Sequence, residues 1–411
     1  MAKTNAYYIE LENKYGAHNY KPLPVVLEKG EGVHVWDVEG NRYFDFLSAY
    51  SAVNQGHCHP RIINALKTQA EKLTLTSRAF YNSVLGEFEK YITEFFGYDK
   101  VLAMNSGVEA VETGLKLCRK WAYEKKGVPE HEAKIIVVKD NFHGRTLGVI
   151  SFSTDPDSYG GYGPYLPGFE VVDYNNIEAI TEAIGQRNVA GVMVEPIQGE
   201  AGVIVPQDGY LKAIREACTE HNVLFLADEV QTGIARTGKM LACDHEGVRP
   251  DVLILGKALS GGVLPVSAVL ADDEIMLSIK PGQHGSTYGG NPLSCAVAME
   301  ALKVVKDENL VERANKLGEV FRQRMREIDS ELVTDVRGKG LLNAIDIKPW
   351  GDGKSAYDIC LMLRDNGLLA KQTHVHTIRF APPLVISKEQ IHECCDIIEQ
   401  TILSVSEHVN A

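Results

Sequence analysis

The 411-residue chain lacks any apolar run near the roughly 20 residues that a membrane-spanning helix requires. It also lacks repeats, low-complexity segments and any concentrated basic stretch, and its net charge of −13 argues against nucleic acid as a partner. Eight scattered cysteines without a Cys-x-x-Cys pair predict reduced thiols rather than a disulfide framework. The opening residues lack the apolar core of a signal peptide, so the expected location is the cytoplasm.

Three short motifs imitate binding sites but are incomplete. His-Cys-His at residues 57–59 has no further ligands at a suitable spacing, so no metal site is predicted. Gly-Lys-Ser at residues 353–355 imitates the end of a phosphate-binding loop, but position 348 is lysine where glycine is expected. Residues 337–340 begin like a dinucleotide fingerprint whose third glycine is missing. A nucleotide-binding dehydrogenase is therefore disfavoured.

The composition, 45% hydrophobic and 24% charged, is that of a globular protein, and the length suits two domains. Short apolar segments alternate with helical ones from about residue 83 to 270, which predicts an α/β fold with a mainly parallel sheet. We expect an N-terminal arm (1–50), a large domain (51–292) and a small C-terminal α/β domain (293–411). The strands expected in the large domain are residues 100–104, 134–138, 191–195, 223–227, 252–255 and 265–271.

The two ends of the chain give further expectations. The arm reads as irregular apart from a hairpin over residues 33–46. A long helical stretch follows residue 292 and runs to about residue 328. Strands are expected near residues 341–347 and 377–380, and Ser387-Lys-Glu-Gln390 is the capping box of a final helix.

A lysine and a carboxylate follow two of these strands. Lys257 leaves the apolar run of residues 252–255 after Gly256, and Asp228 ends the run of residues 223–227. Parallel strands bring such residues to one sheet edge, where α/β proteins bind ligands. Burial lowers the pKa of a lysine and makes it a nucleophile. The pair could be a plain ion pair, but it also suits pyridoxal phosphate, which needs a lysine and an acid for its ring nitrogen.

A third element of such a site lies at residues 105–110. Asn105-Ser-Gly-Val-Glu-Ala110 follows a strand and opens a helix, whose free amides can bind phosphate. Strand–turn–helix units of this kind are common, so this motif gains weight only together with Lys257 and Asp228.

The chain resembles the ornithine aminotransferases, within the fold-type I, class III pyridoxal-phosphate aminotransferases, over essentially its whole length. The resemblance implies a large domain with a mainly parallel sheet and a smaller C-terminal domain. It rests on Tyr15-Gly-Ala-His-Asn-Tyr20, Phe46-Leu-Ser-Ala-Tyr50, Val194-Glu-Pro-Ile-Gln-Gly-Glu200, Ala227-Asp-Glu-Val-Gln-Thr-Gly233, Leu255-Gly-Lys-Ala-Leu-Ser-Gly-Gly262 and His284-Gly-Ser-Thr-Tyr-Gly-Gly-Asn-Pro292.

The resemblance implies a role for each cofactor-site residue. Lys257 would hold the cofactor covalently and shuttle the proton, and Asp228 would pair with the ring nitrogen. The remaining cofactor contacts would be Gln231 at the phenolic oxygen, Phe142 and Val230 on the two ring faces, Ser106, Gly107 and Val108 at the phosphate, and Ser286 and Thr287 from a neighbouring subunit. A homodimer with shared sites follows, with a higher assembly left open. Without the resemblance, Phe142 and Val230 would read as core residues.

Substrate recognition would depend on two arginines. From composition alone Arg145 and Arg379 read as surface or structural residues, but arginine binds carboxylates in bidentate geometry. By resemblance, Arg145 would bind the α-carboxylate of L-ornithine with help from Tyr20. Glu200 would mask Arg379 in this half-reaction and release it for 2-oxoglutarate. Tyr50 and Glu195 complete the expected substrate site.

The function implied is transfer of the δ-amino group of L-ornithine to 2-oxoglutarate by a ping-pong mechanism. The alternatives are acetylornithine and 4-aminobutyrate aminotransferases, and a glutamate-semialdehyde aminomutase. Tyr20 can contact a free α-amino group, and this favours ornithine. An aminomutase needs no second carboxylate receptor, so Arg379 with Glu200 counts against it.

Overall fold

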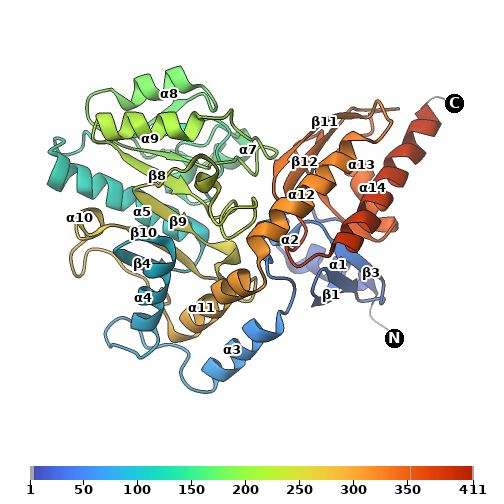
Figure 1. Ribbon diagram of the computed structural model, residues 1–411, viewed down its shortest axis with the longest axis horizontal. Coiled ribbons are helices and arrows are strands. Elements are labelled where there is room, and N and C mark those ends of the chain that lie inside the picture. The colour runs from blue at the N-terminus through green and yellow to red at the C-terminus, as the bar shows by residue number, and fades with distance from the viewer. Residues whose placement is uncertain (1–3, 352, 410–411) are drawn as a thin grey trace.

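The computed structural model describes residues 4–351 and 353–409, arranged as two lobes (Figure 1). The larger lobe is built on a seven-stranded sheet with the order β4-β10-β9-β8-β7-β5-β6. β10 runs opposite to the other six strands, so the predicted mainly parallel sheet is confirmed. Its strands are β4 (Lys100–Met104), β5 (Lys134–Val138), β6 (Phe169–Val172), β7 (Val189–Val194), β8 (Leu224–Asp228), β9 (Val252–Leu255) and β10 (Ser267–Ala271).

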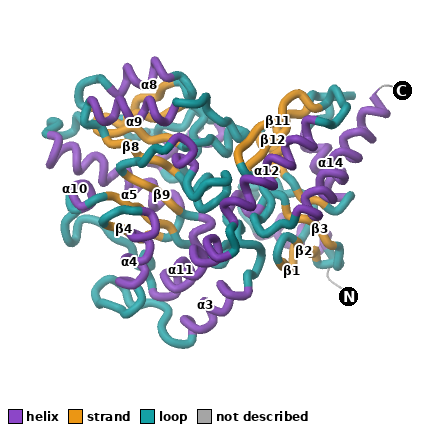
Figure 2. The backbone as a smooth tube through the Cα atoms, viewed as in Figure 1, coloured by secondary structure: helices purple, strands orange, loops and turns teal. Residues whose placement is uncertain are grey.

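Helices cover both faces of this sheet because its central strands β7, β8 and β9 are buried at every position. Alternate residues of a strand face opposite sides: Ile135 and Val137 of β5 pack with α5, whereas Ile136 and Val138 pack with α8 and α9. Figure 2 shows the strands between these helices. The helices of this lobe are α4 (Leu85–Phe96), α5 (Gly107–Trp121), α6 (Leu147–Ile150), α7 (Pro156–Tyr159), α8 (Ile177–Ile184), α9 (Tyr210–Glu220) and α10 (Asp273–Met276), with single turns η1 (Ala122–Lys126), η2 (Ala242–Glu246) and η3 (Lys257–Ser260).

The second lobe joins the two ends of the chain. One four-stranded sheet has the order β1 (Leu27–Glu31), β2 (His34–Asp37), β3 (Arg42–Asp45), β13 (Leu368–Leu369). Residues of the arm therefore pair with the C-terminal region. A second sheet has the order β11-β12-β15-β14. Its strands are β11 (Val333–Lys339), β12 (Leu342–Ile347), β14 (Lys371–Thr373) and β15 (Thr377–Phe380), and α13 (Ala356–Asp365) and α14 (Lys388–Val409) complete the lobe.

Three helices connect the lobes: α3 (Pro60–Ala70), α11 (Pro292–Asp307) and α12 (Leu310–Arg326). The expected single stretch after residue 292 is therefore two helices, because Asn309 has a left-handed backbone with φ of 52° and interrupts the pattern. One apolar core continues from β9 and β10 through α11 and α12 to β12, β15 and α14. Among the described helices, none is both long and apolar enough to cross a membrane.

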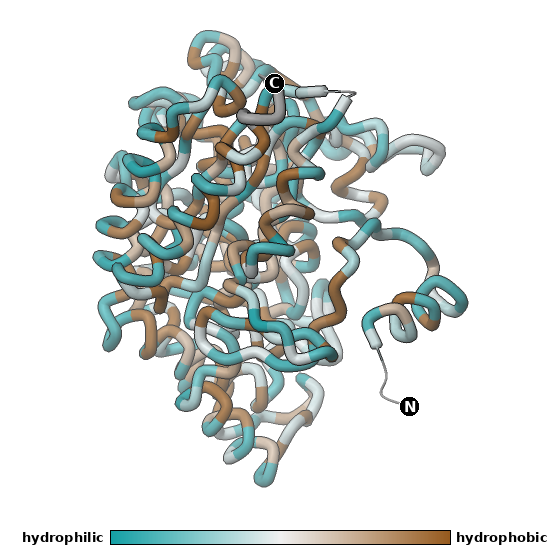
Figure 3. The backbone as a smooth tube through the Cα atoms, turned by 90° about the vertical axis from the view of Figure 1, so that its right-hand side faces the viewer, coloured by the Kyte–Doolittle hydropathy of each residue, from teal (hydrophilic) through white to brown (hydrophobic). Residues whose placement is uncertain are grey.

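The arm is less irregular than expected. The hairpin is confirmed as β2 and β3, but α1 (Asn5–Tyr15), whose first turn is capped by Thr4, was not expected from the sequence. None of its residues is buried, and Figure 3 shows it standing apart from the body near the N-terminus. A short turn, α2 (Ser48–Ser51), follows β3. The missed helix has no apolar stripe, which is the signal that sequence reasoning uses to find helices.

Candidate functional site

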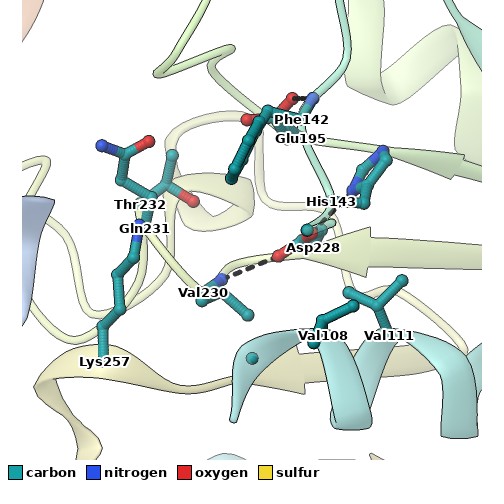
Figure 4. A pocket seen from close by; sticks show the side chains of 12 residues that line it. Val108, Val111, Phe142, His143, Glu195, Asp228, Val230, Gln231, Thr232 and Lys257 are labelled. Carbon is teal, nitrogen blue, oxygen red and sulfur yellow. Dashed lines mark hydrogen bonds and ion pairs between the residues drawn. The ribbon is translucent and has the colours of Figure 1, made fainter. Parts of the chain in front are cut away.

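A pocket of about 240 Å³ opens at the carboxyl ends of the large sheet's central strands. Asp228 ends β8 and pairs in register with Ile254 of β9, which places it beside the exit to Lys257. The strand order predicted from the two apolar runs is therefore confirmed. The residues that line the pocket are Gly107, Val108, Val111, Phe142, His143, Gly144, Glu195, Asp228, Val230, Gln231, Thr232 and Lys257 (Figure 4).

Lys257 sits in an environment that favours the neutral amine. Burial lowers the pKa of Lys257 to about 8, and the positive charge of Arg379 acts in the same direction. Asp228, Glu200 and Glu195 oppose that shift without cancelling it. Its φ of 45° lies in the left-handed region, a costly conformation for a residue with a side chain. A strained backbone and a lowered pKa make Lys257 the candidate nucleophile of the site.

Asp228 is buried and fixed by two donors. The Nδ1 of His143 donates to its Oδ2 at 2.6 Å, and the amide of Val230 donates to its Oδ1 at 3.0 Å. Burial alone would lower the pKa of His143, but the hydrogen bond and charge of Asp228 outweigh burial and raise it. The pair therefore presents an oriented carboxylate to the pocket.

Phe142 and Val230 lie on opposite sides of the space between Asp228 and Lys257 (Figure 4). The Oε2 of Glu195 accepts a hydrogen bond from the Phe142 amide at 3.0 Å and so holds Phe142 in place. Burial raises the pKa of Glu195 to about 7. The gap between Phe142 and Val230 is the shape that a flat aromatic ring requires.

The amino end of α5 closes one side of the pocket. Ser106 and Glu109 form a capping box, and Ser106 is anchored to β10 because the Ser267 hydroxyl donates to its carbonyl at 2.7 Å. A Cβ on Gly107 would lie 2.8 Å from the side chain of Val230, so only glycine permits this approach. The capping box uses the amides of Ser106 and Glu109, so those of Gly107 and Val108 can serve a ligand, and this end of the pocket suits a phosphate.

The substrate-side residues meet at the rim. Arg379 of β15 is 3% exposed, and its Nη1 donates to the Glu200 carboxylate at 2.9 Å. The guanidinium carbon lies 4.9 Å from the centre of the Tyr50 ring. Tyr50 belongs to a left-handed turn, with φ of 59°, which turns its ring toward Arg379. The expected Glu200–Arg379 pair is thus present, in a place where a released arginine could bind a carboxylate.

Other predicted residues are not brought into this pocket by the single chain. Tyr20 is 80% exposed, and Arg145 is exposed with its guanidinium carbon 5.5 Å from the centre of the Phe142 ring. Ser286 accepts a hydrogen bond from Asn105 at 2.9 Å, while Thr287 is exposed. Tyr20, Arg145 and Thr287 are thus exposed, whereas Ser286 is half-buried.

The donors present fit pyridoxal phosphate. A ring between Phe142 and Val230 would have the Asp228 carboxylate at its nitrogen and Lys257 at its reactive carbon. Gln231 lies against the loop of Gly199, where an added Cβ would collide with its amide. Its polar head is thereby held at the pocket wall, where it can bond a ring substituent.

Comparison with known proteins agrees with this geometry. The family model "Aminotransferase class-III" matches residues 15–402. The chain belongs to the class III aminotransferases. This class III chain is 62% identical to the mitochondrial ornithine aminotransferase of Rattus norvegicus, over 98% of this chain and 91% of that one.

Solved structures give the same picture. The ornithine aminotransferase of Toxoplasma gondii superposes with a TM-score of 0.98 at 48% identity, covering 100% of this chain and 96% of that one. An acetylornithine aminotransferase from Elizabethkingia anophelis has a TM-score of 0.91 at 63% identity, covering 98% and 100%. The expected fold, class III membership and pyridoxal phosphate cofactor are confirmed.

Sequence reasoning missed the contact of His143 with Asp228 and the place of Thr232 in the pocket. The position of His143, directly after the residue expected to stack on the cofactor, was the available signal. Nothing in the sequence marks Thr232 apart from its neighbours in the Asp228–Gly233 segment. Both residues are buried, so their roles depend on packing that no short motif encodes.

Proposed function

We propose that the chain transfers the δ-amino group of L-ornithine to 2-oxoglutarate, giving glutamate 5-semialdehyde and glutamate. The observation that carries the proposal is the Glu200–Arg379 ion pair beside Tyr50 at the rim of the Lys257 pocket. A two-substrate aminotransferase needs a carboxylate receptor for one substrate that is hidden from the other. Identities of 56% to 63% to ornithine aminotransferases over almost the whole chain support the same substrate.

The cofactor-side residues would act on protons and charge. Bound pyridoxal phosphate supplies an electron-withdrawing ring that stabilises the negative charge left when a substrate C–H bond breaks. Asp228, fixed by His143, would keep a proton on the ring nitrogen and so maintain that electron withdrawal. The Lys257 amine, with its pKa lowered to about 8, would take the proton from the substrate carbon and return it at the neighbouring position.

Two carboxylate receptors would divide the half-reactions. With ornithine bound, Arg145 would hold the α-carboxylate and Tyr20 the α-amino group, so that the δ-amino group reaches the cofactor. Glu200 would keep Arg379 neutralised and so repel an incoming α-carboxylate. With 2-oxoglutarate bound, Glu200 would release Arg379 to the α-carboxylate, and Arg145 would hold the distal one.

Acetylornithine is the second candidate substrate, because a structural relative at 63% identity is an acetylornithine aminotransferase. The deciding experiment adds ornithine, N-acetylornithine and 4-aminobutyrate separately to the purified holoenzyme without a keto acid. We expect ornithine to change the cofactor absorbance fastest. A faster reaction with either of the other amines would refute the proposed substrate.

We also propose a homodimer in which Ser286 and Thr287 reach the phosphate end of the partner's site. The exposure of Thr287, together with that of Phe80 and Tyr81, which are 73% and 104% exposed, supports an interface on this side of the chain. Sedimentation would measure the assembly. A cytoplasmic location stays a prediction, since the rat and fruit-fly relatives are named as mitochondrial, and cell fractionation would test it.

Subunit complementation tests the shared site directly. A Lys257→Ala chain is mixed with a chain carrying Ser286→Ala and Thr287→Ala, each impaired when alone. A mixed dimer has one site with both defects and one with neither, so we expect roughly a quarter of full activity to return. No recovery from well-folded mixed dimers would refute the sharing of residues across the interface.

A further inference from the structure

The loop that carries Glu200 is held by one face of the small-lobe sheet. Residues 198–204, here called the Glu200 loop, are closed by hydrogen bonds between the backbones of Gln198 and Ile204 at 2.9 and 3.2 Å. Ile197 and Val203 pack against Leu342, Ala344 and Ala381 of that face. The loop belongs to the large-lobe chain segment, where Gln198 donates to the Lys139 carbonyl at 2.6 Å, and its far side packs against the small lobe.

The register of the sheet gathers several polar residues on the same face. Asp346 of β12 is opposite Thr377 of β15, and Arg379 is opposite Ala344, which also faces Arg337 of β11. Residues opposite each other in a sheet share a face. Arg337 and the proposed substrate receptor Arg379 therefore lie on the same face, on either side of Ala344.

Arg337 holds the loop from this face at Gly202. Its Nε and Nη2 donate to the Gly202 carbonyl at 2.9 and 2.7 Å. Asp346 accepts from Nη1 and Nη2 at 2.7 and 3.0 Å and fixes the plane of the guanidinium. Thr377 donates to the same carboxylate at 2.6 Å. Gly202 has φ of +113°, so the approach of Arg337 coincides with a backbone that favours glycine.

A second contact holds the loop at Glu200 itself. The Thr373 hydroxyl donates to the Glu200 carbonyl at 2.7 Å, and Arg379 reaches the Gly199 carbonyl at 3.4 Å. The loop backbone is thus held at three carbonyls, while the Glu200 side chain remains 40% exposed. The backbone contacts fix the position of the Glu200 backbone. Glu200 can therefore move away from Arg379 only by rotation of its side chain.

We propose that Arg337 is a positioning residue for substrate choice. Asp346 orients Arg337, and Arg337 holds the Glu200 loop so that the Glu200 carboxylate stays paired with Arg379 while ornithine binds. This inference rests on the function proposed above for Glu200 and Arg379. Loss of the Arg337 hydrogen bonds to the loop lets Glu200 move away from Arg379. The exposed positive charge then admits the α-carboxylate of glutamate in the ornithine half-reaction, so selectivity falls without loss of the lysine chemistry.

The test is a cycle of wild type, Arg337→Gln, Glu200→Gln and the double variant, each as holoenzyme. Single-turnover rates with ornithine and with glutamate give the selectivity ratio. We expect Arg337→Gln to lower the ratio about tenfold, the scale of lost hydrogen bonds from a charged donor. In the Glu200→Gln background the same change should have no further effect. Arg337→Lys, which keeps a donor, should restore part of the ratio.

Matched variants separate positioning from general damage. Asp335→Asn removes an exposed carboxylate that contacts Arg337 but not the loop, so we expect the wild-type ratio. Thr373→Val removes the hydrogen bond to the Glu200 carbonyl and should lower the selectivity ratio even if Arg337→Gln fails to fold. Equal losses with both amines, or an undiminished effect in the Glu200→Gln background, would overturn the inference. A wild-type ratio in Glu200→Gln refutes the proposed Glu200 function itself, whereas a wild-type ratio in the Arg337 and Thr373 variants alone refutes only the positioning role.

Discussion

Lys257, Asp228 and Phe142 follow strands of one sheet, whereas Tyr20, Glu200 and Arg379 come from the arm, a loop and the small lobe. The first group lines one pocket and is held by short contacts such as that between His143 and Asp228. The second group ranges from buried Arg379 to Tyr20, which is 80% exposed. The difference teaches that the proposed reacting groups are built into one sheet edge, while the residues proposed to choose the substrate lie on segments that packing brings together.

The largest expected effect is on the cofactor side and falls on both half-reactions alike. Lys257→Ala should lower turnover by about 10⁴-fold or more, because the covalent attachment and the proton carrier are lost together. Borohydride reduction followed by peptide mass analysis should find the cofactor on Lys257 in wild type and on no lysine in the variant. Exposed Lys67→Ala is the control, with wild-type labelling and rate. Fixation of the cofactor at another lysine in the wild-type protein would contradict the assignment.

A change on the substrate side should separate the two half-reactions. Glu200→Ala exposes Arg379 permanently, so we expect reaction with glutamate to gain on reaction with ornithine by about 10²-fold. The measurement is the pair of single-turnover rates without keto acid. Glu200→Asp, which keeps the charge on a shorter side chain, should fall between wild type and alanine. An unchanged preference would mean that the Glu200–Arg379 pair is structural only.

A smaller effect is expected where the substrate side is most exposed. Tyr20→Phe removes one hydroxyl that would bind the α-amino group of ornithine, so KM for ornithine should rise about tenfold, with KM for 2-oxoglutarate unchanged. Tyr15→Phe in the same arm is the control, since Tyr15 is 74% exposed and has no proposed role. Equal increases for both substrates would contradict a contact specific to ornithine.

The smallest effect concerns Glu195, which contacts the Phe142 amide and the loop before Glu200 and so connects the two regions. Burial raises the pKa of Glu195 from 4.5 to about 7. The folded state therefore holds this proton more tightly than the unfolded state, which adds to the free energy of unfolding. That stabilisation is complete below about pH 4.5 and is lost as the pH rises through 7. Glu195→Gln should remove this dependence. The Tm of wild type minus that of the variant should therefore be a few degrees higher at about pH 5 than at about pH 8. A difference that grows with pH would show that the carboxylate is ionised when folded.

Much of the fold was predictable because its signals are local. The apolar runs of β4, β5 and β9 match their predicted bounds, and the box Ser387–Gln390 begins α14 with both expected hydrogen bonds. The missed strand β6 is only partly buried and sits at the edge of the sheet, where the apolar pattern is weaker. Helix α1 was missed because propensity and a Thr4 cap, rather than a buried stripe, mark it.

The sequence by itself determined the chemistry of this protein. A lysine after one apolar strand, an aspartate ending another and a glycine opening a helix were expected to converge, because parallel strands share an edge. Burial at that edge lowers the pKa of the amine. Only the tertiary structure decided how that aspartate is fixed by His143 and how Arg337 meets the Gly202 carbonyl. Those contacts join residues 85 and 135 positions apart, and separations of that size are settled by the packing of whole elements rather than by any local pattern.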